Sequence, residues 1–128
     1  MEQIRTRVLC VDDSVDLVVM LARMINGQPD LENVGGMASA DGLSAEVERR
    51  RPDVVVLDLN MPGAPPLAAI RELARRAPQC RVITYSAHDD DATIDAAIDA
   101  GAWEHISKNK DPFDILHAIR RVAARPAA

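Results

Sequence analysis

The sequence predicts an α/β protein with a doubly wound, five-stranded parallel sheet and five helices. Short apolar runs alternate with segments of helical hydrophobic spacing five times along the chain. Apolar residues make up 48% and charged residues 27% of the 128 residues, which is an ordinary globular balance. We therefore expect one domain over 1–128, with its core at about 6–124 and a tail or the start of a linker at 125–128.

The first strand–helix unit begins at residues 8–11, a short apolar run. Asp12-Asp13-Ser14 follows with residue types that start helices, and apolar side chains then recur at helical spacing until Gly27. The second unit starts with a weaker strand at 31–37, which contains two glycines, and continues with a helix over 41–51. Both units fit the βα alternation.

The third strand is predicted at 53–58, where an unbroken aliphatic run implies burial on both faces. A loop at 62–66 leads into a third helix that ends before Pro78. The fourth strand is predicted at 81–86 and its helix at 90–100.

The fifth strand, 103–107, is shorter and more polar, and Pro112 opens the last helix. The fourth helix should bury a face formed by Ile94, Ala97, Ile98 and Gly101. Polar or glycine-rich strands belong at sheet edges, so the second and fifth strands should be the outer ones. With right-handed crossovers this favours the order 2-1-3-4-5, the flavodoxin-like arrangement.

Composition excludes several kinds of protein. The chain has one Trp, one Tyr and one Phe and a net charge of −5, which argues against stacking on single-stranded nucleic acid and against binding a phosphate backbone. Arg49-Arg50-Arg51 fits a solvated helix end better than a nucleic-acid patch. With no signal peptide and no run of ~18 apolar residues, we expect a cytoplasmic protein without a membrane partner. Cys10 and Cys80 should be reduced, buried thiols.

Polar residues stand where the carboxyl ends of the predicted strands meet. They are Asp12 and Asp13 after the first strand, Asp58 closing the third, Ser86 closing the fourth and Lys108 just past the fifth. Singly, each has an ordinary explanation as a helix cap, strand end or surface residue. Together, three converging carboxylates would have raised pKa values unless a cation lay among them, and Mg²⁺ suits such an oxygen-rich pocket.

The remaining side chains suit a phosphoryl group. The Ser86 hydroxyl and the Lys108 ammonium can each hold a phosphoryl oxygen. Asp58 stands alone at the end of the central strand and is the candidate nucleophile, since carboxylates form acyl phosphates. Asp12 and Asp13, as neighbours in a loop, are better placed as metal ligands.

This constellation resembles the response-regulator receiver domain of two-component signalling over essentially the whole chain. The resemblance is carried by Val11-Asp12-Asp13-Ser14, Asp58-Leu59-Asn60-Met61-Pro62-Gly63, Ser86-Ala87-His88-Asp89-Asp90 and Gly101-Ala102, with Lys108 six residues later. The Ser-Ala-His-Asp-Asp motif looks most like the branch of the family that has a C-terminal helix-turn-helix output domain. The same is true of Lys-Asn, which stands where the family frequently has Lys-Pro.

The resemblance implies a role for each matched residue. Asp58 would accept a phosphoryl group from a histidine kinase phosphohistidine or a phosphotransfer protein. Asp13, Asp58 and the Asn60 backbone carbonyl would ligate Mg²⁺, for which Mn²⁺ could substitute, and Asp12 would act through water. Ser86 and Lys108 would hold phosphoryl oxygens, and the side chains at Asn60 and His88 would tune hydrolysis. Such a domain catalyses only its own phosphorylation and dephosphorylation.

Two positions depart from the family pattern. His105 stands where the family usually has Tyr or Phe, which makes the switch weaker, different or pH-sensitive; a hydrogen-bonded edge-strand histidine is the plainer interpretation. Ala64-Pro65-Pro66 should stiffen the loop before the third helix. Trp103 fits either a face used for output or a half-covered edge position.

Alternatives remain open at this point. A pseudo-receiver would keep the fold and bind partners without being phosphorylated. A phosphatase or flavin protein would use a related sheet, although Asp12-Asp13 replaces the phosphate-cradling loop that a flavin needs. A homodimer is open, and we expect no direct nucleic-acid binding by this domain, whereas a separate effector domain could bind DNA. The sequence names neither the kinase nor the regulated process.

Overall fold

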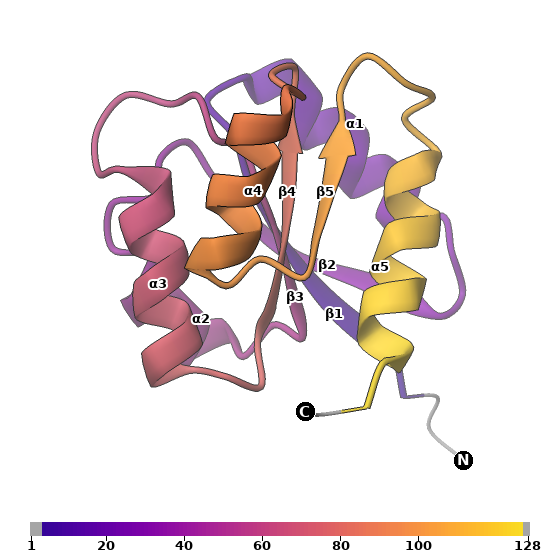
Figure 1. Ribbon diagram of the computed structural model, residues 1–128. Coiled ribbons are helices and arrows are strands. Elements are labelled where there is room, and N and C mark those ends of the chain that lie inside the picture. Colours follow the sequence, from indigo (N-terminus) through magenta and orange to yellow (C-terminus); the bar gives the residue numbers. More distant parts are fainter. Residues whose placement is uncertain (1–3, 127–128) are drawn as a thin grey trace.

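The chain folds into a single parallel sheet of five strands with helices on both faces. The computed structural model describes residues 4–126 (Figure 1). The strand order is β2-β1-β3-β4-β5. The predicted class, the five helices and the flavodoxin-like order are confirmed. Residues 1–3 and 127–128, part of the predicted domain and tail, lie outside the described residues.

Strands and helices alternate without exception in the described part of the chain. The strands are β1 (Thr6–Val11), β2 (Leu31–Met37), β3 (Val54–Leu57), β4 (Arg81–Ser86) and β5 (Glu104–Ser107). The helices are α1 (Val15–Asn26), α2 (Leu43–Arg50), α3 (Pro66–Arg76), α4 (Asp91–Ala100) and α5 (Asp114–Ala124). No helix among residues 4–126 is both long enough and apolar enough to cross a membrane.

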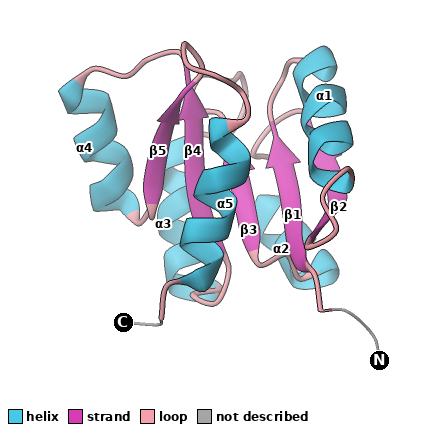
Figure 2. Cartoon of the chain, turned by 90° about the vertical axis from the view of Figure 1, so that its right-hand side faces the viewer, coloured by secondary structure: helices cyan, strands magenta, loops and turns pink. Residues whose placement is uncertain are grey.

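The core has two layers, one on each face of the sheet. On one face α1 and α5 cover alternate strand residues such as Val8, Val56 and Tyr85 (Figure 2). On the other face α2, α3 and the end of α4 cover the residues between them, such as Leu9 and Val55. The central strands are therefore buried on both sides, which explains their unbroken aliphatic sequence.

Several predicted helix boundaries are wrong by one or two residues because local turns precede the helices. Asp111 accepts a hydrogen bond from the Phe113 N–H at 2.9 Å, so Pro112 belongs to a turn and α5 starts at Asp114. Gly42 is left-handed (φ 71°) before α2, which excludes Asp41 from that helix. Asp90 caps α4 and lies outside it.

Two predictions about individual side chains differ in outcome. Ile98 is 43% exposed, so its expected place on the buried face of α4 is wrong. The helix has four Ala and only two Ile, so helical spacing alone does not distinguish its two faces. Cys10 and Cys80 are buried free thiols, as predicted. Arg49 and Arg50 pair with Glu46 of their own helix, which agrees with a solvated helix end.

Candidate functional site at the carboxyl edge of the sheet

The predicted site residues meet at the carboxyl edge because the strand register aligns the strand ends. Asp58 donates its N–H to the Val11 carbonyl at 3.0 Å, which holds the residue after β3 beside the end of β1. Lys108 donates its N–H to the Ser86 carbonyl at 2.9 Å, which does the same for β5 and β4. Backbone pairing thus sets the side chains around one crevice.

Three carboxylates form the centre of this site. Asp12, Asp13 and Asp58 each offer an oxygen, and these atoms all lie within 4.8 Å of one another. Asp12 and Asp58 are each only 4% exposed, whereas Asp13 is exposed. Such a group of hard oxygen donors is the ligand set that Mg²⁺ prefers.

The electrostatics of Asp58 agree with the prediction for converging carboxylates. Burial is the largest cause that raises the pKa of Asp58 above its ordinary value, and the charges of Asp12 and Asp13 raise it further. The Asn60 N–H, which donates to Asp58 Oδ1 at 3.2 Å, and the Lys108 ammonium act against this shift. The net direction is upward, so the negative charge at Asp58 is costly here.

Lys108 supplies the one cation seen among these carboxylates in the described residues. Its Nζ lies 2.6 Å from Asp12 Oδ2 and 3.5 Å from Asp58 Oδ1. The ammonium also lies 5.7 Å from the centroid of the Tyr85 ring. Lys108 is therefore bonded to Asp12 more closely than to Asp58, which leaves the Asp58 carboxylate less neutralised.

Ser86 and His88 lie together at the end of β4. The Ser86 hydroxyl is fully buried, and its oxygen accepts a hydrogen bond from the His88 N–H at 3.1 Å. The hydroxyl proton remains available for an acceptor. The side chains of His88 and Asn60 are exposed, at the rim of the crevice.

His105 lies on β5, paired in register with Thr84 of β4. Its Nδ1 is 2.8 Å from Thr84 Oγ1, whereas its Nε2 is buried and has no hydrogen-bond partner. Burial lowers the pKa of His105, and Asp89, Asp90 and the His88 backbone oppose that shift. The edge-strand histidine is thus hydrogen-bonded at one ring nitrogen only.

The sequence interpretation assigned no role at the site to four residues beside it. Ser107 and Asn109 flank Lys108 and bond to the loop after β4, Asp89 is the acceptor for Ser107, and Tyr85 lies under the lysine. A polar residue at the end of a strand next to a predicted lysine was the available signal for Ser107. Its partner depends on the path of a loop, which residue spacing does not give.

Two prolines lie where the loop before α3 meets the helix. Pro65 is the N-cap of α3 and Pro66 its first residue. Gly63 adopts φ 95°, and the Ala64 N–H donates to Asp41 Oδ1 at 2.8 Å. This bond joins the loop before α3 to the residue that precedes Gly42 and α2.

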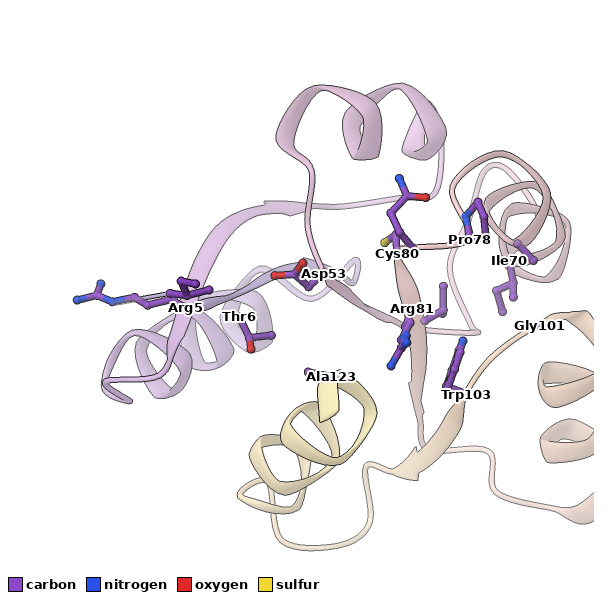
Figure 3. Close-up of a pocket in the computed structure, with 14 residues that line it drawn as sticks. Arg5, Thr6, Asp53, Ile70, Pro78, Cys80, Arg81, Gly101, Trp103 and Ala123 are labelled. Atoms are coloured by element: carbon purple, nitrogen blue, oxygen red, sulfur yellow. The ribbon is translucent and has the colours of Figure 1, made fainter. Parts of the chain in front are cut away.

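A cavity of about 780 Å³ lies at the opposite end of the sheet and takes no part in this site (Figure 3). Its lining includes the start of β1 and β4 and the half-buried Trp103. The Arg81 guanidinium lies 4.2 Å from the Trp103 ring centroid. Trp103 is therefore a half-covered edge residue at the amino ends of the strands.

Comparisons with known proteins agree with one another. Residues 8–120 match the model of the response regulator receiver domain. The transcriptional activator protein ExaE of Pseudomonas putida is 34% identical over 121 residues, which cover 91% of this chain and 55% of that protein. The nitrate/nitrite response regulator protein NarL of Escherichia coli K12 is 28% identical, with 91% and 54% covered. The chain spans about half the length of these curated relatives.

Solved structures give the same picture. The response regulator domain of Thermotoga maritima CheB has a TM-score of 0.85 and 27% identity, with 95% of this chain and 98% of that one covered. A two-component response regulator of the LuxR family from Aurantimonas sp. SI85-9A1 has a TM-score of 0.88 and 28% identity, with 94% and 86% covered.

Proposed function

Since this chain belongs to the response-regulator receiver family of two-component signalling, we propose that Asp58 accepts a phosphoryl group from a phosphohistidine of a sensor kinase or phosphotransfer protein. The observation that carries the proposal is the group of three carboxylates, two of them buried, beside one lysine. Burial, and then the charges of Asp12 and Asp13, raise the pKa of Asp58, and carboxylates perturbed in this way are typical of functional sites.

Asp58 is the nucleophile because its carboxylate is the less firmly bound of the two buried ones. Asp12 has a 2.6 Å bond to Lys108 and accepts the Ser14 N–H at 2.9 Å, whereas Asp58 has the 3.2 Å bond from Asn60 and the lysine at 3.5 Å. A carboxylate oxygen of Asp58 forms the new bond to phosphorus as the bond between phosphorus and the donor imidazole breaks. Hydrolysis later transfers the phosphoryl group to water and restores the carboxylate.

The acidic crevice fits Mg²⁺, with Mn²⁺ as a substitute. Asp12, Asp13, Asp58 and the Asn60 backbone carbonyl would hold the ion, Asp12 through water, and the donor set is entirely oxygen. When bound, the ion neutralises charge on the carboxylates and on the phosphoryl oxygens. The buried Cys10 thiol does not compete for metal, since burial and the Asp12 charge raise its pKa to about 12.

Ser86 and Lys108 bind the phosphoryl oxygens. The Ser86 hydroxyl donates one hydrogen bond, and the Lys108 ammonium moves from Asp12 toward the added negative charge. The exposed side chains of Asn60 and His88 stand at the rim and influence the access of water to the acyl phosphate. His105 takes the place of the usual switch ring, and burial lowers its pKa, which favours the neutral imidazole.

The phosphoryl group shifts an equilibrium between two conformations and changes a partner face on α4, β5 and α5. Because the chain spans about half of its curated relatives, an output domain would carry the response in the whole protein. The receiver domain over 1–128, with its core at about 6–124, would not itself bind nucleic acid, and its net charge of −5 supports that view.

Intact-protein mass spectrometry tests the proposal. With Mg²⁺ and a small phosphodonor such as acetyl phosphate, the chain should gain the mass of one phosphoryl group. Removal of Mg²⁺ by a chelator and the substitution Asp58→Asn should each abolish the gain. An adduct that persists in Asp58→Asn contradicts the assignment of Asp58. No adduct in the unmodified chain indicates a pseudo-receiver, and turnover of aryl phosphates well beyond one equivalent indicates a phosphatase.

A further inference from the structure

The two groups proposed to hold phosphoryl oxygens, Ser86 and Lys108, belong to different strands. Their relative position depends on how residues 107–109 bind the loop after β4. The Lys108 N–H donates to the Ser86 carbonyl at 2.9 Å, and the Ser107 hydroxyl donates to Asp89 Oδ2 at 2.8 Å. The Asn109 side-chain amide donates to the Ala87 carbonyl at 3.2 Å. Three successive residues therefore bond to the last residue of β4 and to two residues of the loop that follows it.

A fourth bond joins two members of this group to each other. The Asn109 N–H donates to Ser107 Oγ at 3.0 Å. The Ser107 hydroxyl is thus used as both donor and acceptor, and Ser107 is only 7% exposed. A proline at position 109 would have no N–H to donate, and an alanine at 107 would leave both bonds unmade. We call residues 107–109 and their four bonds the 107–109 clamp.

We propose that Ser107 and Asn109 are positioning residues for phosphoryl transfer at Asp58, acting through the clamp on Ser86 and Lys108. The inference rests on the proposed function and adds two residues to it. Neither side chain touches the phosphoryl group. The clamp fixes the end of β4, where the Ser86 hydroxyl lies, against the backbone that carries the lysine.

Positioning of this kind has a kinetic signature. The same hydroxyl and ammonium stabilise charge when the bond between Asp58 and phosphorus forms and when water later breaks it. A looser clamp therefore slows both reactions by similar factors. It leaves the donor concentration for half-maximal rate unchanged, since the side chains of Ser107 and Asn109 do not contact the donor. A loss of folding stability alone would change neither rate of the folded protein.

The test compares Ser107→Ala, Ser107→Thr and Asn109→Ala with the unmodified chain, using acetyl phosphate and Mg²⁺. We expect Ser107→Ala to lower the maximal phosphorylation rate and the hydrolysis rate of the isolated phosphoprotein by about 10-fold each, and Asn109→Ala by about 3-fold. Ser107→Thr keeps the hydroxyl and should restore both rates to within about 2-fold.

Ser39→Ala is the matched control, because the Ser39 hydroxyl accepts the N–H two residues ahead, Asp41, at 3.2 Å in a loop outside the clamp. It should keep both rates.

Unchanged rates in Ser107→Ala, or equal losses of rate in Ser107→Ala and Ser107→Thr, overturn the proposed role of the clamp. If Ser107→Ala does not fold, the same two rates are measured for Asp89→Ala and Asn109→Ala, and unchanged rates in both overturn the proposed role of the clamp. Absence of an adduct in the unmodified chain overturns the proposed function and the clamp together, whereas a normal adduct with unaffected variants overturns the clamp alone.

Discussion

The two ends of the sheet differ in how far their charged side chains are paired with opposite charges. At the carboxyl edge, three carboxylates lie together and one lysine pairs with two of them. The pKa of Asp58 is raised by burial and by its acidic neighbours. At the amino edge, Arg120 binds Asp30, and its hydrogen bonds are the largest cause that lowers the pKa of that carboxyl. Arg121 and Arg125 bind Glu104 in the same manner. At the carboxyl edge the carboxylates repel one another, and a bound cation would relieve that repulsion. At the amino edge the charged side chains are paired with one another within the fold.

Lys108→Met should produce the largest change, because it removes the cation from the repulsive edge. Buried Asp12 and Asp58 would lose their counter-ion, so we expect the free energy of unfolding at pH 7 to fall by about 2 kcal/mol without metal. Saturating Mg²⁺ should recover most of the loss. Urea unfolding with and without Mg²⁺ measures both effects.

Lys110→Met is the control, since Lys110 is an exposed lysine two residues away. It should change the free energy of unfolding by no more than about 0.5 kcal/mol. A Lys108→Met protein as stable as the unmodified chain would mean that the carboxylates do not depend on this ammonium. The view that the carboxylates at the carboxyl edge repel one another would then be wrong.

Asp58→Asn should stabilise the metal-free protein, because it relieves repulsion at a buried position. We expect a gain of about 1 kcal/mol at pH 7. The sign follows from the raised pKa: the Asp58 carboxyl favours folding below its ordinary value of 3.8, and that contribution is lost as pH rises through the raised value. The advantage of Asp58→Asn should therefore appear as pH rises above 3.8 and be absent below it.

Urea unfolding across this pH range measures the gain. In saturating Mg²⁺ the difference should reverse, since the substitution removes a ligand. Asp53→Asn, at the amino edge, is the comparison variant, and its difference in stability from the unmodified chain should be the same with and without Mg²⁺. An Asp58→Asn protein that is less stable than the unmodified chain at pH 7 without metal contradicts the prediction.

The sequence predicted the carboxyl edge well because parallel strands bring their ends together whatever their side chains. The order 2-1-3-4-5 and the meeting of Asp12, Asp58 and Lys108 follow from that rule together with polar edge strands. The preference of Lys108 for Asp12 over Asp58 did not follow, because it depends on a difference of less than an ångström between two distances.

Other features depend on local geometry that spacing does not encode. The Ser107 bond to Asp89 needs the path of the loop after β4, and the late start of α5 needs the turn at Asp111. The exposure of Ile98 reflects a short helix whose Ala and Ile residues would suit either face. The ion pairs of the amino edge, such as Arg120 with Asp30, join residues far apart in sequence and were not predictable from charge alone.

Arg120→Gln should produce the smallest change, at the edge where charges are paired. Both side chains are substantially exposed, at 37% for Arg120 and 51% for Asp30, so solvent screens the pair. We expect a loss of no more than about 0.5 kcal/mol at pH 7. Asp30 favours folding above its ordinary pKa of 3.8 because Arg120 lowers that pKa, so the effect should fade as pH falls below 3.8.

A double-mutant cycle with Asp30→Asn in urea isolates the pair, and 1 M salt should reduce the coupling further. Coupling as large as the Lys108→Met effect would mean that both edges carry comparable electrostatic energy, and the contrast between them would then lie only in the sign.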